Sequence, residues 1–395
     1  MKDLLAQANS QRETVTAYRR ALHSFAECGF SLPKTTDYVT KALLEMGYKP
    51  QKYGKGGIVC EKKGARARPV ILLRADMDAL PLAEKTSLPF RAQNGCMHAC
   101  GHDMHTAMLL LAARLLAARD VPFTVRFVFQ AAEETLSGAR ILCELGVLKD
   151  VKAALMLHVI PAQELKTGTV FLPHGGVGAP AARFFSLDFY GESAHVGESF
   201  RGKDALTAML DVYRLLQEEA EKCGEDLFFT VGSMRAGDAP NVVAENARMA
   251  GSFRSFDESK VAAFEDALFR IARAASASAD IRPSILGGAP ALINDGHTAS
   301  VIEKALLALD IPYLRPEGTR SMAAEDFSHM AKRVPSTALA IAAGSPKCGY
   351  EYPLHHPKVL FDEDVLPIGA AVYAASAIAL ARAASLHTFT KGRRA

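Results

Sequence analysis

The sequence lacks a strong surplus of either charge, because 46 lysines and arginines face 43 aspartates and glutamates in 395 residues. The resulting formal charge of +3 leaves no basic footprint for nucleic acid, so we expect no nucleic-acid partner. No stretch reaches the roughly 20 apolar residues that span a bilayer. The closest, PIGAAVYAASAIALA near the C-terminal end, is shorter and rich in alanine. It predicts a buried helix, and we expect no membrane partner.

Signals for secretion are also missing. The start, MKDLLAQANSQRE, has no apolar core of a signal peptide. The seven cysteines are odd in number and scattered along the chain, so we expect reduced thiols and a cytoplasmic location. The chain also has no HExxH helix, no paired CxxC ribbon, no GxSxG elbow and no Walker A loop.

What the sequence does contain is an alternation of short apolar runs and helix-like segments. The runs are PVILLRAD, FTVRFVFQ, KAALMLHV and STALAIAAGS, which end at or near Asp76, Gln130, His158 and Ser345. Helical patterns such as HTAMLLLAARLLAAR and SGARILCELGVL lie between them. This alternation predicts an α/β fold with a mostly parallel sheet covered by helices.

The middle of the chain has a different rhythm. Strand, helix, strand, strand, helix and strand patterns follow one another from ARFFSLDFYG to DIRPSILGG, which is the order of a ferredoxin-like α+β unit. Stretches rich in glycine and proline, PHGGVGAP and GGAPALINDG, flank this region as hinges. We therefore expect an inserted domain at 180–288 within a discontinuous domain made of 1–179 and 289–395.

The stretch MHACGHDMHTAM crowds Cys100, His102, Asp103 and His105 into six residues at the entrance of a predicted helix. Each of these groups is costly to bury alone. Thiolate and imidazole suit zinc and other borderline transition ions, so a metal would make the crowding favourable. The simpler interpretation is a core thiol, a hydrogen-bonded histidine and an aspartate that caps the helix.

Acidic and imidazole side chains follow the other apolar runs. Glu133 and Glu134 come directly after one run, where one carboxylate can bind a metal while its neighbour moves protons. The alternative is an acidic helix N-terminus. His158, the His355–His356 pair and Asp78 each have an equally simple explanation, as a core histidine, a surface loop and a turn residue. Together they place a thiol, several imidazoles and several carboxylates beyond the carboxyl ends of strands, where open α/β sheets gather their functional groups.

The motifs LLRADMDALPL, MHACGHDMHTAMLL, QAAEE, LHV and LHHPKVLFDEDVL occur in an order and spacing that resemble a known family. It is the aminoacylase/hippurate hydrolase branch of the metal-dependent exopeptidases, which includes indole-acetyl-amino acid hydrolases and acyl-diaminopimelate deacetylases. The resemblance runs from about Tyr18 to Leu366. The chain departs from the usual His-Pro-Glu at Phe25-Ala26-Glu27 and has Ala131 where proline is common. These departures affect local loop shape and the subfamily, hence the substrate.

The resemblance implies a two-metal centre and assigns residues to it. The implied ligands are Cys100, His102, Glu134, His158 and His355, for two divalent ions that could be zinc, manganese, cobalt or nickel. Glu133 resembles the general base, and Asp78 resembles a carboxylate that orients a metal-bound imidazole. In the inserted domain, GESAHVG, APNVV and GSFRSF match family segments. His195 would reach the reacting carbonyl, and Asn241 and Arg254 would bind the substrate carboxylate.

The function implied by the resemblance is hydrolysis of the amide bond of a small N-acyl-amino acid, which yields a carboxylic acid and a free amino acid. The family also implies that the inserted domain acts as a lid and dimerisation domain in a homodimer or higher homo-oligomer. One rival function is a metallo-dipeptidase or carboxypeptidase that acts on small peptides. Another is a metal-binding or thiol-regulated interaction protein without activity. Glu133 argues against the latter, since metal binding alone does not need a second carboxylate.

Overall fold

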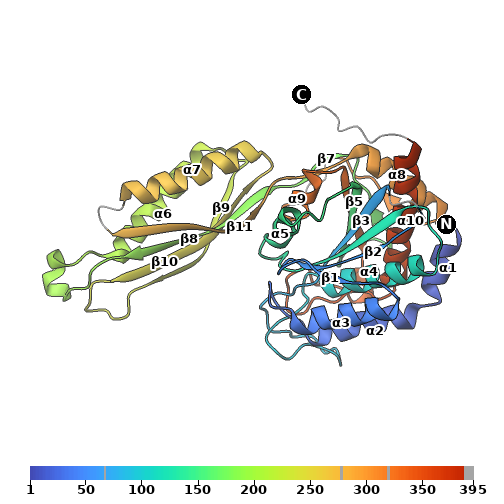
Figure 1. Cartoon of the computed structure of the whole chain (residues 1–395). Helices are drawn as coiled ribbons and strands as arrows, with labels where there is room; N and C mark the ends of the chain where they lie inside the picture. The colour runs from blue at the N-terminus through green and yellow to red at the C-terminus, as the bar shows by residue number, and fades with distance from the viewer. Residues whose placement is uncertain (66–67, 276–278, 318–320, 387–395) are drawn as a thin grey trace. The chain divides into compact units, whose positions relative to one another are not determined.

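The structure is a computed structural model that describes residues 1–65, 68–275, 279–317 and 321–386 (Figure 1). These residues form two compact units. The first comprises Met1–Gly178, Ile293–Arg320 and Asp326–Ala395, and the second comprises Ala179–Leu292 and Ser321–Glu325. The short return at Ser321–Glu325 was not predicted from the sequence. It joins the second unit because the Arg254 guanidinium donates a hydrogen bond to the carbonyl oxygen of Met322 at 2.8 Å.

The first unit is built on an eight-stranded sheet in the order β1-β2-β4-β3-β5-β14-β6-β13. Strands β4, β3, β5 and β14 at its centre run parallel, while β1 and β2 pair antiparallel with their neighbours. Strand β6 pairs antiparallel with β14 and parallel with β13. The bounds are β1 (Gln51–Lys52), β2 (Gly57–Lys62), β3 (Val70–Asp76), β4 (Thr124–Gln130), β5 (Val151–Ile160), β6 (Val170–Phe171), β13 (Tyr313–Leu314) and β14 (Ser336–Ala342). The mostly parallel sheet predicted from the apolar runs is therefore confirmed.

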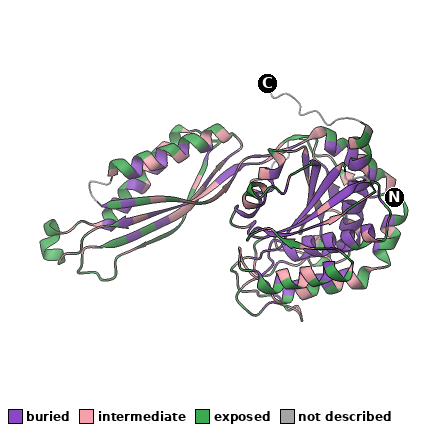
Figure 2. Ribbon diagram, in the orientation of Figure 1, coloured by how far each residue is buried: buried purple, intermediate pink, exposed green. Residues whose placement is uncertain are grey.

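The central strands are buried on both faces, as continuous apolar runs require (Figure 2). All seven residues of β3 are buried. The helices of this unit are α1 (Asp3–Asn9), α2 (Arg12–Ser24), α3 (Pro33–Glu45), α4 (His102–Ala117), α5 (Gly138–Glu144), α8 (Gly296–Ala308), α9 (Ser328–Ala331) and α10 (Val365–Leu386), with a 3-10 turn η2 (Pro346–Cys348).

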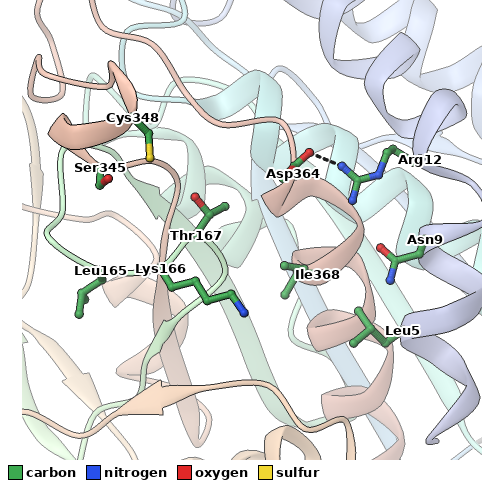
Figure 3. Close-up of a pocket in the computed structure, with 10 residues that line it drawn as sticks. All are labelled: Leu5, Asn9, Arg12, Leu165, Lys166, Thr167, Ser345, Cys348, Asp364 and Ile368. Atoms are coloured by element: carbon green, nitrogen blue, oxygen red, sulfur yellow. Dashed lines mark hydrogen bonds and ion pairs between the residues drawn. The ribbon is translucent and has the colours of Figure 1, made fainter.

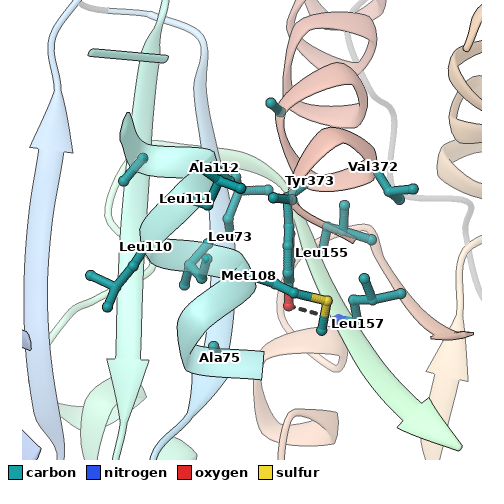
Figure 4. Packing of buried hydrophobic residues seen from close by; sticks show 14 of the residues in the cluster. Leu73, Ala75, Met108, Leu110, Leu111, Ala112, Leu155, Leu157, Val372 and Tyr373 are labelled. Atoms are coloured by element: carbon teal, nitrogen blue, oxygen red, sulfur yellow. Dashed lines mark hydrogen bonds between the residues drawn. The ribbon is translucent and has the colours of Figure 1, made fainter. Parts of the chain in front are cut away.

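Helices α4 and α10 pack side by side against β3 and β5 and form the centre of the core (Figure 4). Met108 of α4 and Leu73 and Leu155 of the sheet are buried there. The hydroxyl of Tyr373 on α10 donates to the carbonyl oxygen of Arg74 at 2.8 Å and accepts from the amide of Leu157 at 2.9 Å. One buried hydroxyl thus satisfies backbone groups of two adjacent strands, so it fixes the helix on the sheet.

Helix α10 is long and apolar enough over Val365–Ser385 to cross a membrane by length and composition. However, 83% of its most apolar window is buried inside the unit. Because the apolar surface already packs against protein, α10 is a core helix, as the sequence predicted.

The second unit has the predicted strand–helix–strand–strand–helix–strand order. Its four strands pair antiparallel in the order β11-β8-β10-β9. The bounds are β8 (Ala181–Tyr190), the 3-10 helix η1 (Val196–Arg201), α6 (Ala205–Lys222), β9 (Phe228–Ala236), β10 (Asn246–Ser255), α7 (Glu258–Ala275) and β11 (Asp280–Ala289). Residues 276–278, between α7 and β11, lie outside the described residues. Two further strands, β7 (Gly176–Ala179) and β12 (Leu292–Asn294), pair with each other.

Candidate metal centre

The candidate ligands of the first unit lie at or beyond the carboxyl ends of its parallel strands. Glu134 follows β4, His158 lies near the end of β5, and His102 opens helix α4. Since β3, β4 and β5 are parallel neighbours, their carboxyl ends meet at one edge of the sheet. The structure brings Cys100 and His355 to the same place, although 255 residues separate them.

A glycine shapes the segment between Cys100 and His102. Gly101 has φ +84°, in the left-handed region that favours glycine, and a β-carbon there would lie 2.4 Å from the side chain of Val159. This conformation allows the loop to turn directly into α4. As a result the thiol of Cys100 and the imidazole of His102 both face His158, and the donor atoms of all three lie within 4.8 Å of one another.

The turn after β4 carries both glutamates. Ala132 and Leu136 adopt positive φ angles of 58° and 50°, which is strained backbone for residues with a side chain. The buried carboxylate of Asp78 accepts hydrogen bonds from the amides of Glu133 at 3.0 Å and Glu134 at 3.2 Å. Asp78 therefore fixes the backbone from which both glutamate side chains project. Gly138 closes the turn, and a β-carbon there would lie 1.7 Å from the carbonyl oxygen of Ala131.

The donor atoms of the five predicted ligands form a chain of short contacts. The Cys100 Sγ lies 3.5 Å from His158 Nε2 and 3.3 Å from His355 Nε2. The Oε1 atom of Glu134 lies 3.7 Å from His355 Nε2 and 3.8 Å from His102 Nε2. Two sets of three donors result, namely Cys100, His102 and His158, and Cys100, Glu134 and His355. The two sets share the thiol, so this arrangement can hold two ions side by side.

Hydrogen bonds orient the imidazoles for metal binding. The Nδ1 atoms of His102 and His158 lie 2.8 Å from the carbonyl oxygens of Asp78 and Val159, and they donate to these oxygens. The neutral His158 ring therefore presents an unprotonated Nε2 to the site, and the Nδ1 hydrogen bond of His102 directs its Nε2 to the same place. The resemblance to the family implies this orienting role for the Asp78 carboxylate. In the structure its backbone carbonyl makes the hydrogen bond to His102, while its carboxylate oxygen Oδ1 lies 3.7 Å away.

Burial and charge also favour a cation at this position. Two buried atoms, His102 Nε2 and Glu134 Oε1, have no hydrogen-bond partner among the described residues. Burial raises the pKa of Glu134 to about 7, and the neighbouring carboxylates of Asp78 and Asp76 add to the increase. Burial lowers the pKa of His158 to about 3, so this imidazole is neutral at pH 7. A thiol, three imidazoles and a carboxylate suit zinc, manganese, cobalt or nickel.

A buried network that was not predicted from the sequence lies behind the ligands. Arg74 is fully buried and pairs with Asp76 at 2.8 Å and with Asp326 at 2.9 Å. The Nδ1–H of His105 donates to Asp76 at 2.6 Å, and its Nε2 accepts from the amide of Val159 at 2.9 Å. Burial by itself raises the pKa of Asp76, but His102, Arg74 and His105 outweigh it and hold the pKa well below its usual range. The signal was present as Arg74 and Asp76 at a strand end, but their partners lie far away in sequence.

The capping role considered for Asp103 is wrong. Gly101 is the N-cap of α4, and no side-chain hydrogen bond caps that end. The Asp103 carboxylate instead accepts from Arg19 Nε and bonds to His23 Nδ1, both at 2.8 Å. These partners lie on α2, so Asp103 ties α2 to α4.

The two adjacent histidines lie in different surroundings. His355 faces Cys100 and has a positive φ of 65°, a strained conformation for a non-glycine residue. His356 instead stacks on Tyr352, with ring centres 4.2 Å apart. The strain at His355 is consistent with a functional role for its position.

In the second unit, the structure brings His195 and Asn241 together. The amide of Val196 donates to the carbonyl oxygen of Asn241 at 3.2 Å, and His195 forms a β-bridge with Val242. The Nδ1 atom of His195 accepts from the amide of Gly197 at 3.1 Å, so the ring proton lies on Nε2. The exposed Nε2–H can therefore act as a hydrogen-bond donor.

Arg254 is not close to these two residues within its unit. It pairs with Ala182 near the beginning of β8, whereas His195 follows Tyr190 at the end of that strand. Eight residues of extended strand separate Ala182 from Tyr190, or about 26 Å at about 3.3 Å per residue. One small molecule bound to Arg254 therefore cannot also contact His195 of the same unit.

A pocket of about 470 Å³ elsewhere on the first unit is lined by residues such as Leu5, Arg12, Lys166, Asp364 and Ile368 (Figure 3). None of the candidate ligands lines it. Arg12 forms an ion pair with Asp364 within this pocket, so the charge of Arg12 is offset by that carboxylate. We do not regard it as the functional site.

Comparison with known proteins identifies a family. Residues 72–379 match peptidase family M20/M25/M40. N-acetylcysteine deacetylase of Bacillus subtilis (strain 168) is 32% identical over 372 residues, which cover 91% of this chain and 95% of that protein.

Solved structures share the complete fold. A putative aminohydrolase from methicillin-resistant Staphylococcus aureus is 29% identical with a TM-score of 0.82, covering 96% of this chain and 100% of that one. The YXEP protein of Bacillus subtilis, described as a dinuclear metal-binding peptidase of the M20 family, is also 29% identical. Its TM-score is 0.74, and the match covers 95% of this chain and 99% of that one. The chain thus belongs to peptidase family M20/M25/M40.

Proposed function

We propose that this protein is a metal-dependent amidohydrolase that cleaves the amide bond of N-acyl-amino acids. Two divalent ions would be held by Cys100, His102, Glu134, His158 and His355. The observation that carries the proposal is the pair of three-donor sets that share Cys100, with a further carboxylate beside them. The deacetylase relative and the dinuclear metal-binding peptidase of the same family support both the reaction and the number of ions.

Metal ions in such a centre would lower the pKa of a water molecule toward about 7 and polarise a carbonyl group. Glu133 is the group we assign as general base. Its Oε2 lies 3.8 Å from His102 Nε2, and its backbone is fixed by Asp78. Glu133 would take a proton from the attacking water and deliver it to the amine nitrogen as the C–N bond breaks. The products are a carboxylic acid and a free amino acid.

The second unit would supply groups that bind the rest of the substrate. We assign the Nε2–H of His195 to the oxygen on which negative charge develops during attack, because its tautomer makes it a donor. Asn241 of one copy and Arg254 of another would bind the amino-acid carboxylate, Arg254 by a charge-assisted hydrogen bond.

We also propose that the protein is a cytoplasmic homodimer or higher homo-oligomer, with residues 180–288 as its lid and dimerisation domain. The separation of Arg254 from His195 supports more than one copy, since one second unit cannot present both to one small substrate. Mixing the inactive variants His195→Ala and Glu133→Gln tests this arrangement. If His195 serves the partner's site, re-association of the mixture restores activity. No recovery, after confirmed exchange of subunits, would contradict it.

The variant Glu133→Gln tests the proposed reaction. We expect two ions per chain by elemental analysis, as in the unmodified protein, and a loss of about 10²–10⁴-fold in kcat on an N-acyl-amino acid, since the general base is removed. Glu144→Gln is a matched control, because Glu144 is an exposed residue of α5 that pairs with Arg140. Full activity of the Glu133→Gln variant would show that Glu133 is not the general base.

A substrate panel separates the proposed function from a peptidase. It should contain acetyl-, benzoyl- and longer acyl-amino acids beside free dipeptides, each assayed for amine release with and without a chelator. We expect chelator-sensitive release from the acylated substrates. Faster hydrolysis of the free dipeptides would favour a dipeptidase or carboxypeptidase, and no release from any substrate would favour a protein without activity.

A further inference from the structure

Two cysteines that the proposed centre does not use lie in contact with each other. Cys28 and Cys96 are 68 residues apart in sequence, and their sulfur atoms lie 2.7 Å apart. This is well below the about 3.5–4.0 Å at which nonbonded carbon atoms attract best. A disulfide bond requires about 2.03–2.05 Å, so a small adjustment of the two side chains would allow it. Both cysteines are half-buried.

The backbone holds the two cysteines at this distance through one shared segment. Cys28 forms a parallel β-bridge with Ala79, and Met97, which follows Cys96, exchanges two hydrogen bonds of 3.0 Å with Leu80. Residues 79 and 80 therefore fix the positions of both thiols.

A second tie joins the two cysteine-bearing segments directly. The side chain of Asn94 accepts from the amide of Cys96 at 3.2 Å and donates to the carbonyl oxygen of Ala26 at 2.7 Å. Closing a bond between the sulfurs would therefore require little movement of the backbone.

The surroundings of the pair are apolar and small. Ala26, Ala79 and Ala92 are buried, and the two cysteines pack against them. Burial raises the pKa of Cys28 to about 12, with a further contribution from its contact with Cys96. The Cys28 S–H donates to the Cys96 sulfur, which makes Cys28 the slower nucleophile and leaves the first step to Cys96.

We propose that Cys28 and Cys96 form a redox-active dithiol site that takes a low-molecular-weight disulfide as its oxidant. The Cys96 sulfur attacks one sulfur of the oxidant, which breaks the S–S bond and releases one thiol. The Cys28 thiol then loses its proton and attacks the Cys96 sulfur, which releases the second thiol. Two electrons and two protons pass to the oxidant, and the protein gains one S–S bond.

The new bond would join segments that flank the metal centre. Ala79 adjoins Asp78, which holds the backbone of Glu133, and Cys96 lies four residues before Cys100. The oxidised form should therefore unfold at a higher temperature than the reduced form, because the crosslink closes a long loop.

The test uses the full-length, metal-loaded protein and oxidised glutathione as the probe. After incubation, remaining thiols are alkylated in denaturant, and peptides are mapped by mass spectrometry. We expect a linked peptide that contains Cys28 and Cys96, the loss of these two thiols from the total of seven, and recovery of both on treatment with a dithiol reductant. Cys28→Ser should instead trap a glutathione adduct on Cys96.

Cys348 provides the matched control, since it is the exposed cysteine on η2. Cys348→Ser should leave the Cys28–Cys96 crosslink unchanged. The proposal is overturned if Cys348 acquires glutathione while Cys28 and Cys96 both remain open to alkylation. It is also overturned if the linked peptides join other cysteines. The variants are used only if their circular dichroism and metal content match those of the unmodified protein.

Discussion

The substitution Asp78→Asn removes the charge that fixes both glutamates while it keeps the size of the side chain. The carboxylate accepts from the amides of Glu133 and Glu134 at 3.0 and 3.2 Å and is fully buried. Hydrogen bonds to charged groups contribute about 1.5–3 kcal/mol each. Asparagine offers one oxygen, so one amide would face an NH₂ group instead. We expect a loss of about 2–4 kcal/mol in the free energy of unfolding.

The same substitution should reduce catalysis through the position of Glu133. Mutation of a residue that orients the ligands of a metal site typically reduces metal affinity or activity by about 10–100-fold. We therefore expect a fall of that size in kcat with little change in KM. Urea unfolding and steady-state amine release measure the two effects. Asp37→Asn is the control, because Asp37 is exposed and pairs only at the surface with Lys41, where such pairs contribute about 0–1 kcal/mol.

Equal behaviour of Asp78→Asn and Asp37→Asn in both assays would refute the positioning role of Asp78. A large loss of stability with normal kcat would mean that Asp78 supports the turn without positioning the base. A large rise in KM alone would place Asp78 in substrate binding instead.

Two further predictions concern stability. Burial by itself lowers the pKa of His23, but the carboxylate of Asp103 outweighs it and raises the pKa. Protonated His23 therefore stabilises the fold fully below about pH 6.5, its unfolded value, and the contribution is lost as the pH rises through the higher folded value. In urea unfolding, the difference in the free energy of unfolding between the unmodified protein and His23→Gln should shrink above about pH 6.5. A difference that grows above this pH would contradict a raised pKa of His23. Gly138→Ala should lower the free energy of unfolding by about 1–3 kcal/mol, because the new β-carbon would lie 1.7 Å from the carbonyl oxygen of Ala131. Gly232→Ala should lower the free energy of unfolding by less, because nothing lies within 4 Å of a β-carbon at that position. Equal losses in the two variants would contradict the steric effect expected at Gly138.

Much of the fold could be predicted because its strongest signals are local. The runs that became β3 and β4 end at Asp76 and Gln130, where the sequence analysis ended them. The two-residue strands β6 and β13 carry no comparable pattern, since their pairing depends on neighbours far away in sequence.

The site could be predicted less completely, for the same physical reason. The ends of parallel strands must meet, so His158 and the residues after β4 were expected to converge. The ion pair between Arg19 and Asp103 was not expected, because the two residues are 84 positions apart in sequence. The network around Asp76 was not expected either. Arg74 bonds to Asp76 and also to Asp326, which lies 252 residues further along the chain. Tertiary packing alone brings such groups together.

The most direct test of the central claim is a crystal structure of the metal-loaded protein with anomalous diffraction measured at the absorption edge of the bound metal. The account predicts two anomalous peaks per chain among the donor atoms of Cys100, His102, Glu134, His158 and His355, with Glu133 beside them. A single peak, or peaks away from these five side chains, would contradict it.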